Sequence, residues 1–153
     1  MKRIITFLSV IVLVLSTVSC RKDAIPSVGA GDEYVDLGLP SGILWKATSE
    51  DPKSQGITYY QAYDYFDPDF DRWITRQDAE ELIEHCTFTA LGNTVRVTGP
   101  NGKRIEIVKD MIWTVEAGGP DAQPYCLIPQ TPTIGYASEN SRHHIHLIKR
   151  PAN

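Results

Sequence analysis

The chain lacks the residue patterns that mark several large classes of enzymes and nucleic-acid-binding proteins. It has no G-x-S-x-G motif, no glycine-rich phosphate loop beside a predicted strand and no Cys-x-x-Cys pair. These absences weigh against serine hydrolases, nucleotide-binding enzymes and structural zinc sites. Basic residues are also few, since 15 Lys and Arg stand against 19 Asp and Glu. Because phosphate contacts require clustered cations, we expect no nucleic-acid partner.

Long apolar runs are also lacking, with one exception near residue 1. Two basic residues precede the largely apolar stretch 4–15, and the small residues 16–19 lead directly to Cys20. This arrangement is typical of an export signal, and the stretch is shorter than the ~20 residues that a membrane-spanning helix needs. A cysteine after small residues resembles the acylation site of bacterial lipoproteins. We therefore expect residues 1–20 to be a lipoprotein signal and Cys20 to carry a lipid anchor; secretion after cleavage nearby is the alternative.

The part of the chain after this signal is limited in size and acidic. Removing 20 of the 153 residues leaves 133, which is enough for one domain and too few for two. Residues 21–32 are small and polar with Gly and Pro, and we expect a flexible tether there, followed by a single domain over 33–153. Two of the 15 basic residues belong to the signal, so 13 face 19 acidic ones, a net charge of −6. The lipid would therefore have to provide the membrane attachment.

Cysteine is scarce beyond the predicted anchor. Only Cys86 and Cys126 remain. Disulfides persist in exported proteins, so these two residues are a possible pair. Cysteine is also among the most buried residue types when it is free. The sequence leaves both interpretations open.

Local signals predict one main helix among short strands. Thr75 and Asp78 have the spacing of a capping box, and the apolar residues that follow have helical spacing, which predicts a helix over about 75–86. Asn101-Gly102 between two alternating runs predicts a β-hairpin. Alternation and turn residues give about seven strands in all, at 34–37, 43–45, 94–98, 104–108, 111–115, 125–128 and 143–148. We therefore expect an α+β domain.

One stretch carries a resemblance to a known family. YVDLGLPSGILWKAT, residues 34–48, resembles the opening signature of the Fibrobacter succinogenes major paralogous domain, which occurs on exported proteins of Bacteroidetes. Further positions match the family's WRLPT-x-x-E-W-x-E-L segment, namely Arg72, Thr75, Asp78, Glu81 and Leu82. Residues 97–102 and the closing 149–151 resemble later parts of the pattern. The resemblance implies a small, irregular C-type-lectin-like α+β domain of mostly antiparallel short strands, related also to formylglycine-generating enzymes, and it implies no reaction.

Two groups of residues are candidates for metal binding. Asp67, Asp69 and Asp71, with Asp78 eleven positions after the first, imitate the oxygen spacing of a calcium loop. Arg72 stands where that loop wants glycine, and a solvated acidic loop is the alternative. His144 and His146 would share one face of a strand, where exposed polar positions are the alternative to a transition-metal site. We expect no resident cofactor, with calcium as the candidate ion.

Aromatic residues interleaved with acids are the candidates for ligand contact. We select Tyr63, Asp64, Tyr65, Phe70 and Trp73, because rings stack on sugar faces and carboxylates accept hydroxyl protons. The alternative is that these rings close the core of a small domain.

The sequence predicts binding without catalysis. We expect an outer-membrane lipoprotein at the cell surface, with a secreted or periplasmic protein as the alternative, that acts as a binding module for a protein or glycan of the cell envelope. The rival hypothesis is a structural or assembly subunit of a surface complex or filament. A third hypothesis is a calcium- or zinc-dependent hydrolase, which would need several metal ligands that converge on one ion.

Overall fold

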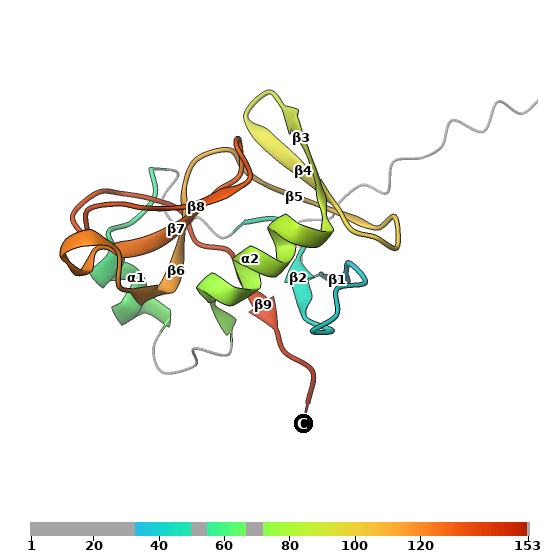
Figure 1. Ribbon diagram of the computed structural model, residues 1–153, viewed down its shortest axis with the longest axis horizontal. Coiled ribbons are helices and arrows are strands. Elements are labelled where there is room, and N and C mark those ends of the chain that lie inside the picture. The colour runs from blue at the N-terminus through green and yellow to red at the C-terminus, as the bar shows by residue number, and fades with distance from the viewer. Residues whose placement is uncertain (1–32, 50–54, 67–71, 153) are drawn as a thin grey trace, which may run out of the picture.

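The structure contains three small antiparallel sheets and two helices (Figure 1). It is a computed structural model that describes residues 33–49, 55–66 and 72–152. The α+β class expected from the sequence is confirmed, with the strands short and antiparallel. The predicted signal, Cys20 and the predicted tether lie outside the described residues. In the described ranges no helix is both long and apolar enough to cross a membrane.

The first sheet joins the two ends of the described chain. Its order is β1 (Tyr34–Asp36), β2 (Leu44–Lys46) and β9 (Ile148–Lys149). The turn between β1 and β2 contains Gly38 and Gly42, both at positive φ, where a side chain would be strained. These two strands agree with the sequence expectation. The predicted strand 143–148 does not form as a whole, because most of it makes isolated bridges to different neighbours before β9 begins.

The second sheet contains the predicted hairpin. β3 (Thr87–Leu91), β4 (Thr94–Thr98) and β5 (Arg104–Val108) pair in chain order. The turn between β4 and β5 places Gly102 at positive φ, and the Asn101 side chain donates to the Asp36 carbonyl at 2.9 Å. Alternate residues of β4 and β5 are buried, as expected for a sheet with one face against the core. β3 was not expected from the sequence.

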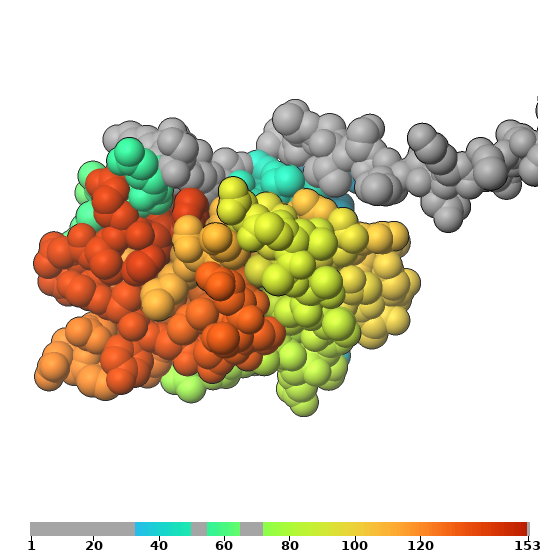
Figure 2. All heavy atoms as spheres, turned by 90° about the horizontal axis from the view of Figure 1, so that it is seen from above, coloured from blue at the N-terminus to red at the C-terminus, as the bar shows by residue number. Residues whose placement is uncertain are grey.

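The third sheet is formed by three consecutive strands. β6 (Ile112–Ala117), β7 (Pro124–Ile128) and β8 (Thr133–Tyr136) pair in order, with a register shift between Trp113 and Ala117. A 3-10 turn, η2 (Pro120–Ala122), lies between β6 and β7. In the space-filling view the orange and red segments of this sheet and its loops occupy one side of the molecule, and the yellow-green segments of the second sheet occupy the other (Figure 2).

Both helices begin with reciprocal side-chain caps. α2 (Arg76–His85) has the predicted capping box, since the Thr75 hydroxyl accepts from the Asp78 amide at 3.1 Å and the Asp78 carboxylate accepts from the Thr75 amide at 2.8 Å. α1 (Tyr59–Phe66) was not expected. Thr58 and Gln61 form the equivalent reciprocal pair at its start, at 3.2 and 3.3 Å. That Thr-x-x-Gln spacing was the available sequence signal, in a segment whose Tyr and Asp residues are weak helix formers.

The core is centred on three tryptophans. Trp45, Trp73 and Trp113 are each at most 1% exposed. The Trp73 indole N–H donates to the Trp113 carbonyl at 2.9 Å, and the Trp113 indole donates to the Ile57 carbonyl at 2.9 Å. The Tyr59 ring of α1 lies 5.9 Å from the Trp73 ring and 5.6 Å from the Trp113 ring. These contacts fix α1 and the start of α2 against β6.

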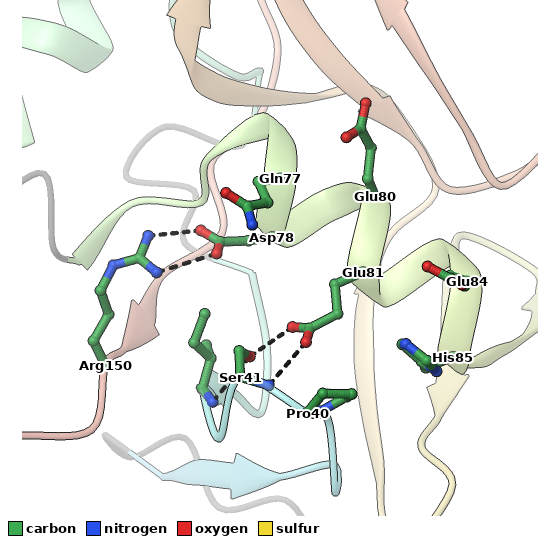
Figure 3. A pocket seen from close by; sticks show the side chains of 10 residues that line it. Pro40, Ser41, Gln77, Asp78, Glu80, Glu81, Glu84, His85 and Arg150 are labelled. Carbon is green, nitrogen blue, oxygen red and sulfur yellow. Dashed lines mark hydrogen bonds and ion pairs between the residues drawn. The ribbon is translucent and has the colours of Figure 1, made fainter.

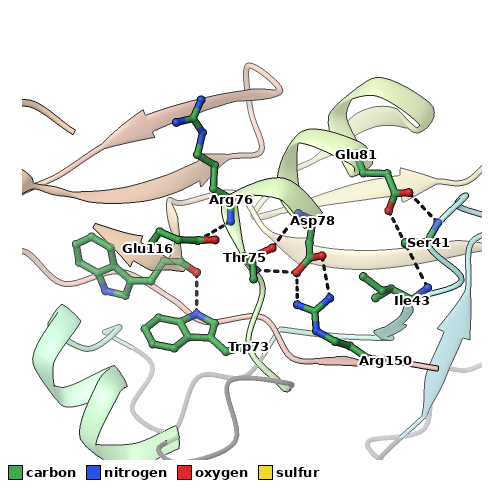
Figure 4. Close-up of polar contacts among 10 residues, drawn as sticks. Ser41, Ile43, Trp73, Thr75, Arg76, Asp78, Glu81, Glu116 and Arg150 are labelled. Atoms are coloured by element: carbon green, nitrogen blue, oxygen red, sulfur yellow. Dashed lines mark hydrogen bonds and ion pairs between the residues drawn. The ribbon is translucent and has the colours of Figure 1, made fainter. Parts of the chain in front are cut away.

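α2 is also held by two polar contacts to distant segments (Figure 4). The Asp78 carboxylate, 5% exposed, receives two hydrogen bonds from the Arg150 guanidinium at 3.1 and 2.7 Å. One turn further along, the Glu81 carboxylate accepts from the Ser41 amide at 2.8 Å and from its hydroxyl at 2.5 Å. The helix thereby links the β1–β2 turn to the segment after β9.

Replacing Asp78 should destabilise the domain more than replacing an exposed acid of the same helix. Asp78→Ala removes the capping box and leaves the half-buried Arg150 without its carboxylate, so we expect the free energy of unfolding to fall by about 2–4 kcal/mol. The control Glu84→Ala, at an exposed position of α2, should change it by less than about 0.5 kcal/mol. Denaturant unfolding measures both. Equal losses in the two variants would contradict the prediction.

Candidate functional site

A polar pocket lies between α2 and the β1–β2 turn (Figure 3). Its volume is about 430 Å³, and its lining combines four acids with two potential cations: Pro40, Ser41, Ile43, Gln77, Asp78, Glu80, Glu81, Glu84, His85 and Arg150. The inner polar groups are engaged with one another, because Glu81 binds Ser41 and Asp78 binds Arg150. These contacts assign the inner residues of this pocket a structural task.

The second pocket is an open groove, which we call the aromatic groove. Its volume is about 450 Å³, and it lies where the start of α2, the loop after β6 and strands β7 and β8 meet; its lining is Arg76, Gly118, Gly119, Pro120, Tyr125, Ile134, Gly135 and Tyr136. The Tyr136 side chain is 52% exposed. The Tyr125 hydroxyl donates to the Gly118 carbonyl at 2.8 Å, and the Arg76 guanidinium carbon lies 4.6 Å from the centre of the Tyr125 ring. Rings and a cation are thus presented together at a surface depression.

Glycines let the backbone pack closely around the two rings. A Cβ added at Gly119 would lie 3.0 Å from the Tyr136 Cβ, and one added at Gly118 would lie 3.4 Å from the Tyr125 ring. A Cβ at Gly135 would lie 2.7 Å from the Ile128 side chain. Larger residues at Gly119 and Gly135 would therefore displace their neighbours. Backbone therefore packs closely against the Tyr125 ring and against the base of the Tyr136 side chain.

The loop beside the groove contains strained backbone. Asp121 and Ala122 in η2 have φ values of 56° and 58°, in the left-handed region that residues with a Cβ rarely adopt. The loop is held closed because the amides of Gly118 and Gly119 both donate to the Gln123 carbonyl, at 3.1 and 3.0 Å. Consecutive residues in such conformations persist only where surrounding contacts impose them.

The charge of Arg76 is compensated by a carboxylate one turn further along α2. Its Nε lies 2.6 Å from the Glu80 carboxylate, and that hydrogen bond is the main reason that the pKa of Arg76 is raised. The Arg76 backbone amide donates to the Glu116 carboxylate at 2.7 Å. Arg76 is thus the charged residue among those that line the groove, and its guanidinium is paired with Glu80, which lines the neighbouring polar pocket.

Three of the five ligand-contacting residues chosen from the sequence have side chains in the described part of the chain: Tyr63, Asp64 and Trp73. Tyr63, 40% exposed, and the exposed Asp64 lie on α1. The choice of Trp73 as a ligand-contacting ring is corrected by its position, since it is 1% exposed and hydrogen-bonded inside the core. Tyr65 belongs to α1, but its side chain and Phe70 lie outside the described residues. Tyr63 and Trp73 therefore differ in exposure, although the ring of each lies near the Tyr59 ring.

Three of the four candidate calcium ligands lie outside the described residues. These are Asp67, Asp69 and Asp71. Asp78, the fourth member of the spacing, is committed to the helix cap and to Arg150. Among the described residues no group of three His, Cys, Asp or Glu side chains is arranged to hold a metal ion.

The histidines near the end of the chain are in different environments. His146 is fully buried beside Trp45, with ring centres 5.7 Å apart, and its Nδ1 lies 3.1 Å from the Ser49 hydroxyl oxygen. The expectation of exposed polar positions is therefore wrong for His146, because this segment crosses the core instead of continuing as an edge strand. His144 lies 3.8 Å from Asp110. Burial lowers the pKa of His146 to about 4.

Of the two interpretations that the sequence left open for Cys86 and Cys126, the structure has the free thiols. Cys126 is buried in β7, Cys86 caps the end of α2, and both are free thiols. Burial raises the pKa of Cys86 to about 11 and that of Cys126 to about 12. Both cysteines therefore act as small apolar side chains.

The residues of the aromatic groove were missed by sequence reasoning, because they come from three separate segments. Tyr136 lies in β8, a strand that the sequence did not predict. The sequence placed Arg76 in a helix and gave no indication of a binding role. The available signal was the run Gly118-Gly119-Pro120 between two strands. Its two glycines have no side chain, so the backbone can pack closely beside Tyr125. Comparison of the chain with protein-family models, curated proteins and solved structures found no match.

The stability of the domain should decrease in mild acid because of His146. Its pKa is about 4 in the folded protein against 6.5 for an ordinary histidine, so the unfolded chain takes up the proton first. This contribution to the free energy of unfolding is complete above pH about 6.5. It is lost as the pH falls toward about 4, and the total loss below that pH is roughly 3 kcal/mol. Denaturant unfolding between pH about 7 and about 5 measures the slope.

His146→Gln should reduce this slope, and His85→Gln, at an exposed position of α2, should leave it unchanged. Some dependence should remain in the first variant, because burial also lowers the pKa of His143. An unchanged slope in His146→Gln would contradict the assignment.

Proposed function

We propose that the protein is a lipid-anchored protein of the cell envelope that binds a protein or a glycan and does not catalyse a reaction. One observation carries the binding role. Three large apolar side chains in the described ranges are well exposed, and all three are tyrosines: Tyr60, Tyr63 and Tyr136. Tyr136 lines an open groove with a preorganised arginine. Exposed tyrosines are favoured in binding surfaces because they supply contact area at a low entropic cost.

The placement of the titratable groups supports binding in preference to turnover. The described Ser49–His146 hydrogen bond joins a hydroxyl to a fully buried imidazole, which a substrate does not reach. Its low pKa also leaves that histidine a poor proton acceptor near neutral pH. The carboxylates Asp78 and Glu81 are engaged in structural contacts.

We also propose that the domain belongs to the Fibrobacter succinogenes major paralogous domain family and has its lectin-like fold. Support comes from the tasks of the residues that carry the resemblance. Ser41 of the signature turn binds Glu81, and Thr75, Asp78 and Arg150 form one hydrogen-bonded unit. Residues that hold distant segments together are those that a family pattern retains for folding. The resemblance therefore supports a proposal about the fold, and it implies no reaction.

The proposed location is the outer membrane, with the domain at the cell surface. It rests on the apolar stretch 4–15, the small residues before Cys20 and the acidic charge of the remaining chain. An acidic domain gains nothing from an anionic bilayer, so acylation of Cys20 would be the means of attachment.

Cys20→Ser should remove both the lipid and the membrane association. We expect metabolic labelling with a palmitate analogue to mark the unaltered protein and not the variant, with the variant appearing in the soluble fraction. Cys86→Ser is the matched control and should retain the label. Labelling of Cys20→Ser, or an unlabelled parent protein found in the medium, would favour secretion after cleavage.

A structural or assembly role is the second candidate, and β3 favours it. Among the described residues, this strand is at the end of its sheet and pairs with β4 alone. Three of its five residues are exposed, Thr87, Thr89 and Ala90. An accessible strand edge of this kind can accept a strand from another chain.

A screen of the purified protein on glycan arrays and in pulldowns from cell surfaces tests the binding role. We expect a saturable partner of one class, with Tyr136→Ala weaker than the parent. Repeating the screen with calcium and with a chelator tests the acidic spacing at Asp67, Asp69 and Asp71, and a calcium-dependent signal lost on Asp69→Ala would assign the ion to that segment. Self-association through β3, with no partner of either class, would favour the assembly role.

A further inference from the structure

We infer that the aromatic groove is a subsite for one neutral pyranose unit of a glycan, with the Tyr136 ring as its stacking platform. This inference rests on the proposed binding function and narrows its ligand class. Four observations support it: the exposed ring, the fixed donor and acceptor pair beside it, the charge balance, and the size of the groove.

The Tyr136 ring is exposed to solvent, and the Gly119 backbone packs against the base of its side chain. The Tyr136 side chain is 52% exposed, although it belongs to a paired strand. Gly119 approaches it so closely that an added Cβ would lie 3.0 Å from the Tyr136 Cβ. A tyrosine has few rotatable bonds, so its ring loses little entropy when the apolar face of a sugar covers it.

Arg76 provides hydrogen-bond donors in the groove, and its ion-pair partner Glu80 lies beside it on α2, in the lining of the neighbouring polar pocket. The Arg76 guanidinium is fixed between the Tyr125 ring, at 4.6 Å, and the Glu80 carboxylate, at 2.6 Å. Both members of the ion pair remain half-exposed, at 46% and 48% of their side-chain surface. Adjacent sugar hydroxyls donate and accept at once, so a guanidinium beside a carboxylate matches them.

The charges of the groove argue against an ionic ligand. The Arg76 guanidinium is already paired with the Glu80 carboxylate, so an anionic sugar meets no uncompensated cation. A cationic ligand has no free face on Tyr125 on the side where Arg76 lies. The remaining match is a neutral ring with hydroxyl groups.

The dimensions also favour a small ring over a folded partner. The groove has a volume of about 450 Å³, within the usual range of small-molecule sites. Its walls come from α2, the η2 loop, β7 and β8, which are joined by hydrogen bonds within one body. A protein partner would need a much larger contact area.

Calorimetric titration of the full chain in mild detergent tests the inference. The probes are short neutral oligosaccharides of glucan, xylan and mannan type, with oligogalacturonate as the anionic comparison. We expect at least one neutral probe to bind, with Tyr136→Ala weakening its affinity about tenfold and Tyr136→Phe retaining it within about threefold, because the ring supplies the contact. Tyr60→Ala is the matched control, since Tyr60 is 58% exposed and does not line the groove.

Arg76→Met provides a second variant in case Tyr136→Ala does not fold, and it should also weaken binding about tenfold. Neutral-sugar binding that neither variant alters would place the sugar elsewhere and overturn this inference while leaving the binding function intact. Stronger binding of oligogalacturonate would overturn the neutral ligand class. Binding of none of these saccharides would overturn the inference, and recovery of a protein partner in the surface screen would separate that outcome from failure of the proposed function.

Discussion

The carboxylate of Asp78 is the contact on which the arrangement of this domain depends. It caps α2 by accepting from Thr75, and it accepts two hydrogen bonds from Arg150 in the segment after β9. One helical turn later Glu81 binds the β1–β2 turn through Ser41. The three small sheets share one apolar core, and α2 adds polar links between segments that are far apart in the sequence. A nearly buried carboxylate contributes strongly to this because its desolvation is offset only when every partner is in place.

Local signals made part of this fold predictable. The capping box at Thr75 identified α2 within about one residue at each end, and Asn101-Gly102 identified the β4–β5 hairpin, because both signals act through backbone geometry next to them. The burial of Trp73 and His146 could not be read in the same way. Their surroundings come from segments far away in the sequence, such as β6 for Trp73 and β2 for His146.

The candidate site illustrates the same limit. Arg76 and Tyr125 are 49 positions apart in the sequence, and they meet only because α2 packs across the third sheet. Composition pointed instead to the dense aromatic and acidic run before α2, of which Tyr63 is exposed and Trp73 is core. A binding surface made from single residues of several elements leaves no periodic pattern. Its sequence trace is indirect and lies in the glycines that let the backbone approach the rings.

The first sheet determines how the domain would respond to mechanical force. β1 and β9 flank β2, and each is antiparallel to it, so the two outer strands run in the same direction. Tension between the start of β1 and the end of β9 would therefore act along the strands and load their hydrogen bonds together in shear, instead of opening them one at a time. Rupture of this sheet under such tension would also separate Arg150, which follows β9, from Asp78.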